Sequence, residues 1–418
     1  MEPLGISEEI YRRLVASAGD PAPAMRAWDG TVWGSPKASA TIVLNHPGSL
    51  RAMLYPPSDL TAGEAYIFND IDLEGDILAC LDFARRLEPI AQKKRRALGI
   101  VRLLRELPDD TRRPDRRPKL RGQLHTRRRD KAAVSSHYDT GNEFFTTFLD
   151  PLMVYSCAHF LDPAESLEAA QRRKLDLICR KLELGSGMQF LDIGCGWGSL
   201  VIHAAINYGV EAVGVTISHE QAELARARVK ESGVENRVTI LEADYRDVTG
   251  SYDAIASVGM FEHVGKRQLS TYFNHVRGLL APGGAFLNHG ITNRDRSGGR
   301  KTATFVNTYV FPDGELAPVE RVIASAERAG FELRDAESLR MSYAETLRRW
   351  LTNIDRNSEL AVGLSTHRTY RTWRLYMAGS VLAFQHAGIS VYQLLLSATD
   401  RPWRFGRGHL LAGDDLPT

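Results

Sequence analysis

Residues 191–198, LDIGCGWG, are a short apolar run that passes into three glycines at alternate positions. An apolar run of this kind is typical of a buried strand. Glycine lets the following turn adopt backbone conformations that a Cβ would forbid, and it lets the backbone approach a ligand closely. A helix is expected from about Ser199 onward. The stretch therefore predicts a strand, a ligand-binding glycine turn and a helix, in that order.

On both sides of this turn, short apolar segments alternate with segments of helical periodicity. Such alternation is typical of an α/β fold with a mostly parallel, doubly wound sheet. The expected strands cover residues 188–193, 210–217, 238–242, 252–258 and 284–289. The expected helices include 164–184, 319–329 and 344–351, and segment 377–398 is expected to be a buried helix or a helix followed by a strand.

The spacing of the glycines limits the ligand. The pattern GxGxG differs from the GxGxxG of dinucleotide-binding folds, and no P-loop Lys-Ser/Thr follows it. Two later segments, GVTISHEQ at 214–221 and DYRD at 244–247, fall where a class I methyltransferase holds S-adenosylmethionine. The sequence therefore predicts a class I, Rossmann-like methyltransferase fold, with Asp192, Gly198 and Ser218 among the cofactor-binding residues. A glycine turn needed only for packing is the alternative.

Length and composition describe a globular protein with two domains, because 418 residues with 43% hydrophobic and 25% charged side chains exceed one ordinary core. The first twenty residues lack the apolar core of a secretory signal. No run of about 18 apolar residues is present, so no spanning helix is expected. The four cysteines lack zinc-ligand spacing and fit a reducing cytosol. We therefore expect a cytoplasmic protein without a metal site.

Positive charge is concentrated in one segment. Residues 111–131 hold ten Lys/Arg against Asp115 and Asp130, although the whole chain carries only +2. We interpret residues 109–130 as a basic linker between a smaller amino-terminal domain, 1–108, and a catalytic domain, 131–418. The linker is either simply solvated or attracted to anionic lipid headgroups, at roughly 1 kcal/mol per basic residue. No aromatic residues interleave with these arginines, so nucleic acid is not an expected partner.

Several further segments, together with the glycine turn, carry a closer resemblance. They are 137–142 (HYDTGN), 149–158 (LDPLMVYSCA), 259–265 (GMFEHVG), 288–291 (NHGI), 309–314 (YVFPDG) and 342–347 (SYAETL). In this order and spacing the chain resembles the cyclopropane-fatty-acid and mycolic-acid cyclopropane synthases, from about Arg129 to Ser397. The resemblance implies that a sulfonium methyl is transferred to an alkene carbon. The carbocation that results then loses a proton as a cyclopropane ring closes.

The resemblance also implies the residues of the site. The family holds a bicarbonate ion as, or beside, the base, and its cradle falls here on Cys157, Glu262, His289, Ile291 and Tyr343. The family's contacts to S-adenosylmethionine fall on Tyr155, Ser156, Gly194, Gly196, Thr216, Gln221, Tyr245 and Arg246. These residue types suit the chemistry, because a carbocation needs a dry pocket and aromatic faces can stabilise it without attacking it.

Each catalytic candidate has a simpler interpretation. Glu262 could be a solvated loop acid, and His289 a structural histidine. Cys157 could be a small buried hydrophobe, its usual role, and could contribute to the cradle through its backbone. Tyr343 could be an ordinary core aromatic. Without the family resemblance we would favour these interpretations.

The product and the partners follow from the same resemblance. The chain length and residues 63–76 (GEAYIFNDIDLEGD) are nearer the long members that act on membrane phospholipids, so we expect a peripheral protein at the inner face of the membrane. The product is either a cyclopropane or a 10-methylene (tuberculostearic precursor) fatty acid, the latter with a partner reductase. A homodimer is expected. The alternative function is a small-molecule or natural-product C-methyltransferase on the same fold.

Overall fold

A computed structural model describes residues 2–91, 94–110, 126–127, 129–130, 141–294 and 304–401. Most of the basic linker, and residues 137–140 of the first motif, lie outside the described residues. The chain forms two compact units. Unit 1 comprises residues 1–119, 300–312 and 354–382, and unit 2 comprises residues 120–299, 313–353 and 383–418. Unit 1 therefore combines the amino-terminal part of the chain with two short segments from its second half.

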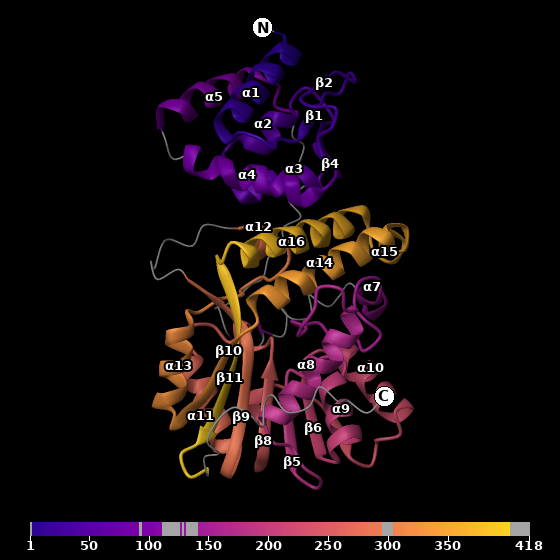
Figure 1. Ribbon diagram of the computed structural model, residues 1–418, viewed down its shortest axis with the longest axis vertical. Coiled ribbons are helices and arrows are strands. Elements are labelled where there is room, and N and C mark those ends of the chain that lie inside the picture. The colour runs from indigo at the N-terminus through magenta and orange to yellow at the C-terminus, as the bar shows by residue number, and fades with distance from the viewer. Residues whose placement is uncertain are drawn as a thin grey trace. The chain divides into compact units, whose positions relative to one another are not determined.

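Unit 2 is built on a seven-stranded sheet with the order β10-β11-β9-β8-β5-β6-β7 (Figure 1). The strands are β5 (Gln189–Ile193), β6 (Glu211–Thr216), β7 (Val238–Glu242), β8 (Tyr252–Val258), β9 (Leu280–Asn293), β10 (Phe331–Ser338) and β11 (Ile389–Ala398). Strands β5 to β9 pair in parallel, whereas β11 runs antiparallel to both β9 and β10. This confirms the predicted mostly parallel α/β sheet. The order places β5 and its glycine turn in the interior of the sheet, between β8 and β6.

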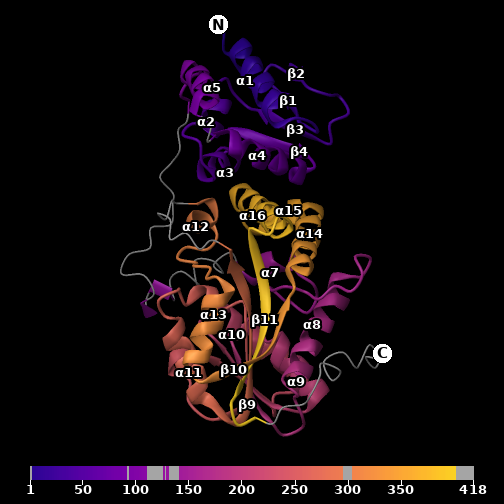
Figure 2. The same ribbon diagram turned by 60° about the vertical axis from the view of Figure 1, so that its left-hand side comes forward.

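Helices cover both faces of this sheet (Figure 2). Alternate residues of β5 point to opposite faces, so Phe190 packs with one set of helices and Leu191 with the other. The first set is α8 (Leu167–Lys181), α9 (Ser199–Tyr208) and α10 (His219–Glu231), and the second is α11 (Leu269–Leu279) and α13 (Val319–Arg328). Ser166 caps α8 and Ser218 caps α10 by accepting a backbone N–H three residues on. The fold is therefore doubly wound, as predicted.

The remaining elements of unit 2 are short or cross into unit 1. They are α7 (Asn142–Thr146), the 3-10 turns η1 (Tyr245–Asp247) and η2 (Phe261–His263), and α14 (Arg340–Arg356). Helix α14 begins four residues before the expected 344–351 segment and ends five residues after it. Segment 377–398 is the end of α16 (His367–Gln385) followed by β11, which confirms the helix-plus-strand alternative.

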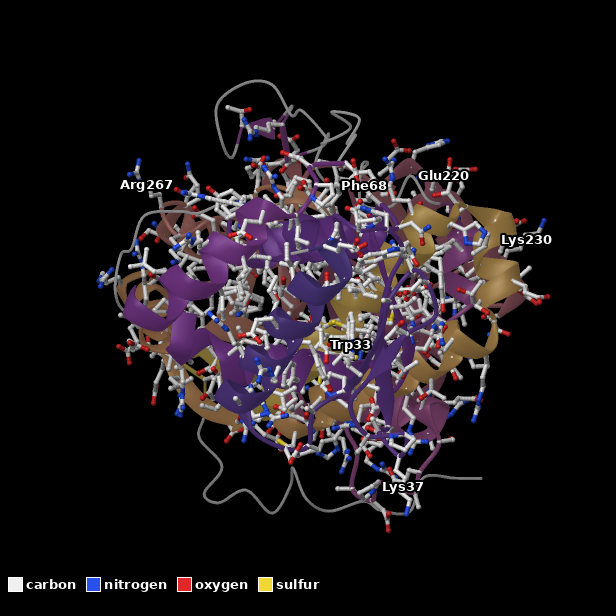
Figure 3. The ribbon with its side chains drawn as sticks, turned by 90° about the horizontal axis from the view of Figure 1, so that it is seen from above. Trp33, Lys37, Phe68, Glu220, Lys230 and Arg267 are labelled. Atoms are coloured by element: carbon white, nitrogen blue, oxygen red, sulfur yellow. The ribbon has the colours of Figure 1, made fainter. Side chains whose placement is uncertain are left out.

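Unit 1 has a four-stranded sheet of its own, in the order β2-β1-β3-β4. Its strands are β1 (Ala24–Arg26), β2 (Val32–Trp33), β3 (Ala40–Leu44) and β4 (Ile71–Gly75). Its helices are α1 (Pro3–Ala18), α2 (Ser49–Leu54), α3 (Asp59–Ile67), α4 (Ile77–Ala91), α5 (Lys94–Glu106), α12 (Phe305–Tyr309), α15 (Ser358–Leu364) and most of α16. The edge strand β2 carries Trp33, which Figure 3 labels. The Trp33 ring stacks on Tyr11 with ring centroids 6.3 Å apart.

Buried polar contacts join the later segments of unit 1 to its amino-terminal part. In α16, Nη1 of Arg374 donates to the hydroxyl of Tyr66 over 3.0 Å, and Nε of Arg374 lies 2.8 Å from Asp355. Arg371 donates to Oδ1 of Asn69 over 2.7 Å. A buried arginine is costly unless it is paired, so these contacts hold α16 specifically against α3 and β4.

Among the described helices, none combines the length and apolar character needed to cross a membrane.

Candidate active site

The glycine turn after β5 takes backbone conformations that suit glycine. Gly194, Gly196 and Gly198 have φ of +83°, +54° and +82°. The N–H groups of Gly194 and Cys195 both donate to the carbonyl of Val215 over 2.9 Å, which ties the turn to the end of β6. A Cβ on Gly196 would have no neighbour within 4 Å. The backbone of Gly196 therefore borders open space in which a ligand can approach closely.

Asp192 lies just before the turn and is buried, with 3% of its surface exposed. Its Oδ1 has no hydrogen-bond partner among the described residues. Burial raises the pKa of this carboxyl to about 7, and the ammonium of Lys174 opposes the rise. A buried acceptor of this kind is costly unless a ligand donates to it, so Asp192 fits a cofactor with an amino group.

The end of β6 and the start of α10 hold the next three predicted cofactor residues together. The hydroxyl of Thr216 donates to Oε1 of Gln221 over 2.7 Å. The N–H of Ser218 donates back to the Thr216 hydroxyl over 3.2 Å, and the Ser218 hydroxyl caps the N–H of Gln221. All three side chains are buried. Their positions are therefore mutually fixed beside the carboxyl end of β5, where ligands bind in open α/β sheets.

Tyr245 and Arg246 form the 3-10 turn after β7. Arg246 is held by Asp244, whose carboxylate accepts from Nε and Nη2 over 2.8 and 2.6 Å, and it also pairs with Asp130 at 3.0 Å. The guanidinium lies over the Tyr245 ring, 5.6 Å from its centroid. Burial raises the pKa of Tyr245 to about 12, so its hydroxyl stays protonated. The pair offers an aromatic face and an ionic anchor next to the turn.

Tyr155 and Ser156 come from the segment before α8. The Tyr155 ring packs against Phe145 and Trp350, with centroids 5.6 and 5.2 Å away, so it stands in an aromatic cluster. The Ser156 hydroxyl accepts a hydrogen bond from Nζ of Lys174 over 2.9 Å. Lys174 is 1% exposed, and burial lowers the pKa of its ammonium to about 8. This buried lysine was not predicted from the sequence.

Glu262 and Ile291 are in direct contact. The backbone N–H of Ile291 in β9 donates to Oε1 of Glu262 over 2.7 Å. The second oxygen, Oε2, is buried and has no hydrogen-bond partner in the described part of the chain. Burial raises the pKa of this carboxyl to about 7. Glu262 is therefore no solvated loop acid, and near neutral pH it can either accept or donate a proton.

His289 lies two residues before Ile291, so both side chains point to the same face of β9. Its Nδ1 is 3.3 Å from Nε2 of Gln393, the residue opposite it in β11. Nε2 of His289 is buried without a hydrogen-bond partner among the residues described. Burial, with the nearby ammonium groups of Lys174 and Lys181, holds the pKa of His289 well below its usual range. The ring is thus neutral.

Cys157 and Tyr343 are linked to the same region through one residue. The thiol of Cys157 lies 3.1 Å from the carbonyl of Ala158 and 3.6 Å from that of Leu339, and the N–H of Tyr343 donates to the Leu339 carbonyl over 2.9 Å. The N–H of Leu339 donates to the carbonyl of Val391, and Val391 in β11 is paired with Ile291 in the neighbouring strand β9. Burial raises the pKa of the Cys157 thiol far above its usual value, so it stays protonated. The five predicted cradle residues therefore fall into two groups, one of Glu262, His289 and Ile291 and one of Cys157 and Tyr343, with the backbone of Val391 between them.

Aromatic side chains pack on both faces of the sheet near these residues. Tyr343 packs on Phe384 with centroids 4.7 Å apart and meets Trp350 at 6.1 Å, edge to face. The Phe261 ring lies against Gly290, because a Cβ there would come within 1.9 Å of it. Gly290 stands between His289 and Ile291, so this ring is on the face of β9 opposite to their side chains, with the cluster that includes Phe286. Aromatic faces can stabilise a cation without reacting with it. Tyr343 and Trp350 thus present aromatic faces within unit 2.

Two buried side chains that contact predicted site residues, Lys174 beside Ser156 and Gln393 beside His289, were not predicted from the sequence. A signal existed for Lys174, since it follows Leu167, Ala170 and Gln171 on the buried stripe of α8, where a lysine is unusual. No corresponding signal marked Gln393 within an apolar strand. Among the described residues, no cluster of His, Cys, Asp and Glu has the arrangement of a metal site.

Comparison with known proteins identifies relatives of the whole chain and of its second half. The chain is 38% identical over 377 residues to a probable fatty acid methyltransferase of Pseudomonas putida, covering 89% of this chain and 90% of that protein. It is 41% identical over 279 residues to the cyclopropane-fatty-acyl-phospholipid synthase of Escherichia coli K12, covering 66% and 70%. It is 39% identical over 283 residues to the tuberculostearic acid methyltransferase UfaA1 of Mycobacterium tuberculosis, covering 65% and 66%.

A solved structure has the same fold as unit 2. The mycolic acid cyclopropane synthase CmaA1, complexed with SAH (S-adenosylhomocysteine) and CTAB, is 32% identical, with a TM-score of 0.61, and covers 64% of this chain and 98% of its own. Residues 125–394 match the family described as mycolic acid cyclopropane synthetase. The chain therefore belongs to this family and is an S-adenosylmethionine-dependent methyltransferase with the class I fold.

Proposed function

We propose that this protein transfers the methyl group of S-adenosylmethionine to a double bond of an unsaturated acyl chain in a membrane phospholipid. The observation that carries the proposal is the buried pair of Glu262 and His289. Each offers one buried polar atom without a hydrogen-bond partner among the described residues. The names of the relatives, which are a fatty acid methyltransferase and an acyl-phospholipid synthase, support an acyl chain as the acceptor.

In this proposal, different residues bind the cofactor, position its methyl group and stabilise the positive charge. The glycine turn, Asp192 and Thr216 bind the cofactor, and Tyr155 directs its sulfonium methyl toward the aromatic cluster. The alkene would attack this methyl, its S–C bond would break with the electron pair going to the leaving S-adenosylhomocysteine, and the positive charge would pass to the acyl chain. An alkene is a poor nucleophile, so fixed positioning supplies much of the rate acceleration. Tyr343 stabilises the carbocation and helps to keep water from capturing it.

Bicarbonate fits the free polar atoms of the cradle. Oε2 of Glu262, protonated in part near neutral pH, and Nε2 of His289 would hold one small anion between them. The N–H of Ile291 already donates to Glu262, so an anion would share this donor rather than find it free. When bound, bicarbonate supplies a base that is not itself alkylated. Glu262 and His289 would fix its place, His289 by donating to it, and Glu262 in its ionised form would receive its proton.

Two products are compatible with these residues. Loss of a proton from the transferred methyl group with ring closure gives a cyclopropane. A hydride shift before the proton loss gives a 10-methylene fatty acid, the precursor of tuberculostearic acid, which a partner reductase would then consume. Relatives named for each outcome are similarly identical to this chain, at 41% and 39%.

Lipid analysis after incubation tests the proposal. Purified protein, methyl-labelled S-adenosylmethionine and oleoyl-phospholipid vesicles should give lipid with one added CH2. Upfield ring protons in the NMR spectrum would identify a cyclopropane, and vinylidene protons a 10-methylene product. Label that enters a water-soluble acceptor and never lipid would contradict the proposal and favour the small-molecule C-methyltransferase. In that case the rate would also be independent of bicarbonate.

We further propose that the protein acts as a homodimer at the cytoplasmic face of the membrane, with unit 1 and the basic linker associating with phospholipid. In unit 1, Arg102 and Leu98 of α5 are both exposed, which gives this helix cationic and apolar groups toward solvent. Vesicle flotation should show binding to anionic vesicles that weakens with salt. Light scattering should give twice the mass of one chain. Equal binding to neutral vesicles would contradict the electrostatic part.

A further inference from the structure

Lys174 is an isolated cation inside unit 2. It projects from the apolar stripe of α8 and is 1% exposed. Its Nζ donates to the hydroxyl of Ser156 over 2.9 Å, and it makes no second hydrogen bond with any residue that the structure describes. A buried ammonium has three N–H donors, so two remain without a partner there. Such a charge is costly to bury and calls for a reason.

The hydrogen bond has a fixed direction. An ammonium group can only donate, so the Ser156 oxygen accepts and its own O–H must point elsewhere. One turn earlier on α8, Nε2 of Gln171 donates to the carbonyls of Ser156 and Val154 over 2.9 and 3.3 Å. Helix α8 therefore fixes both the backbone of Ser156 and the orientation of its hydroxyl, which is left as a donor.

Asp192 provides the opposite polarity nearby. Its Oδ1 is a buried acceptor without a partner among the described residues, and its charge and that of Lys174 act on each other. A directed hydroxyl donor and a free carboxylate acceptor match the two ends of an amino acid, an α-carboxylate and an α-ammonium. S-adenosylmethionine carries both groups on its methionine part.

We propose that Lys174 is a positioning residue of the cofactor site, which fixes the Ser156 hydroxyl as a donor to the cofactor carboxylate and steadies Asp192 as the acceptor for its ammonium group. The inference rests on the S-adenosylmethionine site and not on the identity of the acyl substrate. The simpler alternative is a lysine that only fills and stabilises the core of α8.

Calorimetric measurements of the binding of two nucleosides distinguish a positioning role of Lys174 from a role only in core stability. S-adenosylhomocysteine has the amino-acid tail, whereas 5′-methylthioadenosine lacks it. In Lys174→Met, we expect the Kd for S-adenosylhomocysteine to rise roughly 10- to 100-fold, because a directed hydrogen bond to a charged group is lost. The Kd for 5′-methylthioadenosine should stay within about twofold, which would exclude a general collapse of the site.

Two further variants sharpen the test. Lys181→Met is the matched control, because Lys181 is also buried on α8 but pairs with Glu337 at 2.5 Å. It should leave the preference for S-adenosylhomocysteine over 5′-methylthioadenosine unchanged. Ser156→Ala should raise the Kd for S-adenosylhomocysteine as Lys174→Met does, and the double variant should be no worse than either single variant.

The inference is overturned by any of three results. These are an unchanged Kd for S-adenosylhomocysteine in Lys174→Met, an equal loss for both nucleosides, or additive losses in the Ser156→Ala double variant. A change confined to the bicarbonate dependence of the reaction would also overturn it, since Lys174 would then act on the cradle. Wild-type protein that binds neither nucleoside would overturn the cofactor site itself, which is a separate result.

Discussion

The two oxygens of the Glu262 carboxylate differ in their surroundings, because the N–H of Ile291 donates to one of them over 2.7 Å and the other is buried without a hydrogen-bond partner among the described residues. The first contact fixes the plane of the carboxyl group. The second oxygen is then the one that takes up or releases a proton. With a pKa raised to about 7 by burial, this group is balanced between its two forms near neutral pH. That is the property expected of an acid or base in catalysis.

Glu262→Gln should remove this proton exchange and retain the shape of the side chain. We expect the rate of methyl transfer to lipid to fall roughly 100-fold or more. The Kd for S-adenosylhomocysteine should be unchanged, because the glycine turn and Asp192 are untouched. Glu231→Gln, at an exposed position on α10, is the control and should keep full activity. Activity within a factor of three of wild type would remove Glu262 from the mechanism.

The same variant should change how stability depends on pH. The folded-state pKa of Glu262 is raised, so the unfolded chain loses this proton first as pH rises. The free energy of unfolding of wild type therefore falls progressively between about pH 4.5 and pH 7, and the loss is complete above pH 7. Glu262→Gln avoids the penalty, and urea unfolding should find it more stable than wild type at pH 8.5, by at most about 3 kcal/mol. At pH 4 the difference should vanish, and a gain that is equal at both pH values would contradict this cause.

Much of this fold could be predicted because strong local patterns agree with it. Strands β7 and β8 have the predicted bounds, 238–242 and 252–258, since each is a continuous buried or alternating run between polar turns. Strand β10 was missed. Its sequence, FELRDAES, has charged residues at Glu332, Arg334 and Asp335, and edge strands with one polar face give no clear apolar pattern.

The membership of α16 in unit 1 is also a long-range property. It depends on contacts such as that of Arg374 with Tyr66, 308 positions away, which no local pattern records. The site likewise combines residues that local motifs locate with contacts that arise only when the chain folds. Motifs located Glu262 and His289, but the hydrogen bond to Gln393 arises only when β9 and β11 pair.

Substitutions at two glycines distinguish a glycine that makes room for a ligand from a glycine that makes room for a neighbouring side chain. Gly196→Ala adds a methyl group to open space but requires φ of +54°, so stability should fall by only about 1–2 kcal/mol while S-adenosylhomocysteine binds much more weakly. Gly290→Ala would place a Cβ 1.9 Å from the Phe261 ring and should cost more stability. It should also lower activity by moving Phe261 and the adjacent Glu262. Urea unfolding and calorimetry measure both effects, and normal nucleoside binding by Gly196→Ala would contradict the placement of the cofactor.

Gln393 decides which nitrogen of His289 carries the proton. The amide nitrogen of Gln393 can only donate, so Nδ1 of the neutral ring accepts and the proton resides on Nε2. Nε2 is the atom that lacks a partner among the described residues, and as an N–H it is a donor to an anion in the cradle. Gln393→Leu removes the donor and should let the ring populate both tautomers.

Nitrogen-15 NMR of labelled histidine checks this directly. Wild type should show His289 protonated at Nε2, with no change between pH 6 and 8 because its pKa lies well below the usual value. Gln393→Leu should show a mixture, with the bicarbonate concentration for half-maximal activity raised several-fold and S-adenosylhomocysteine binding unchanged. His289→Ala, which loses the donor entirely, should be the more impaired of the two. A wild-type ring protonated at Nδ1 would reverse the direction of the Gln393 contact and make Nε2 an acceptor, which an anion-binding cradle does not need.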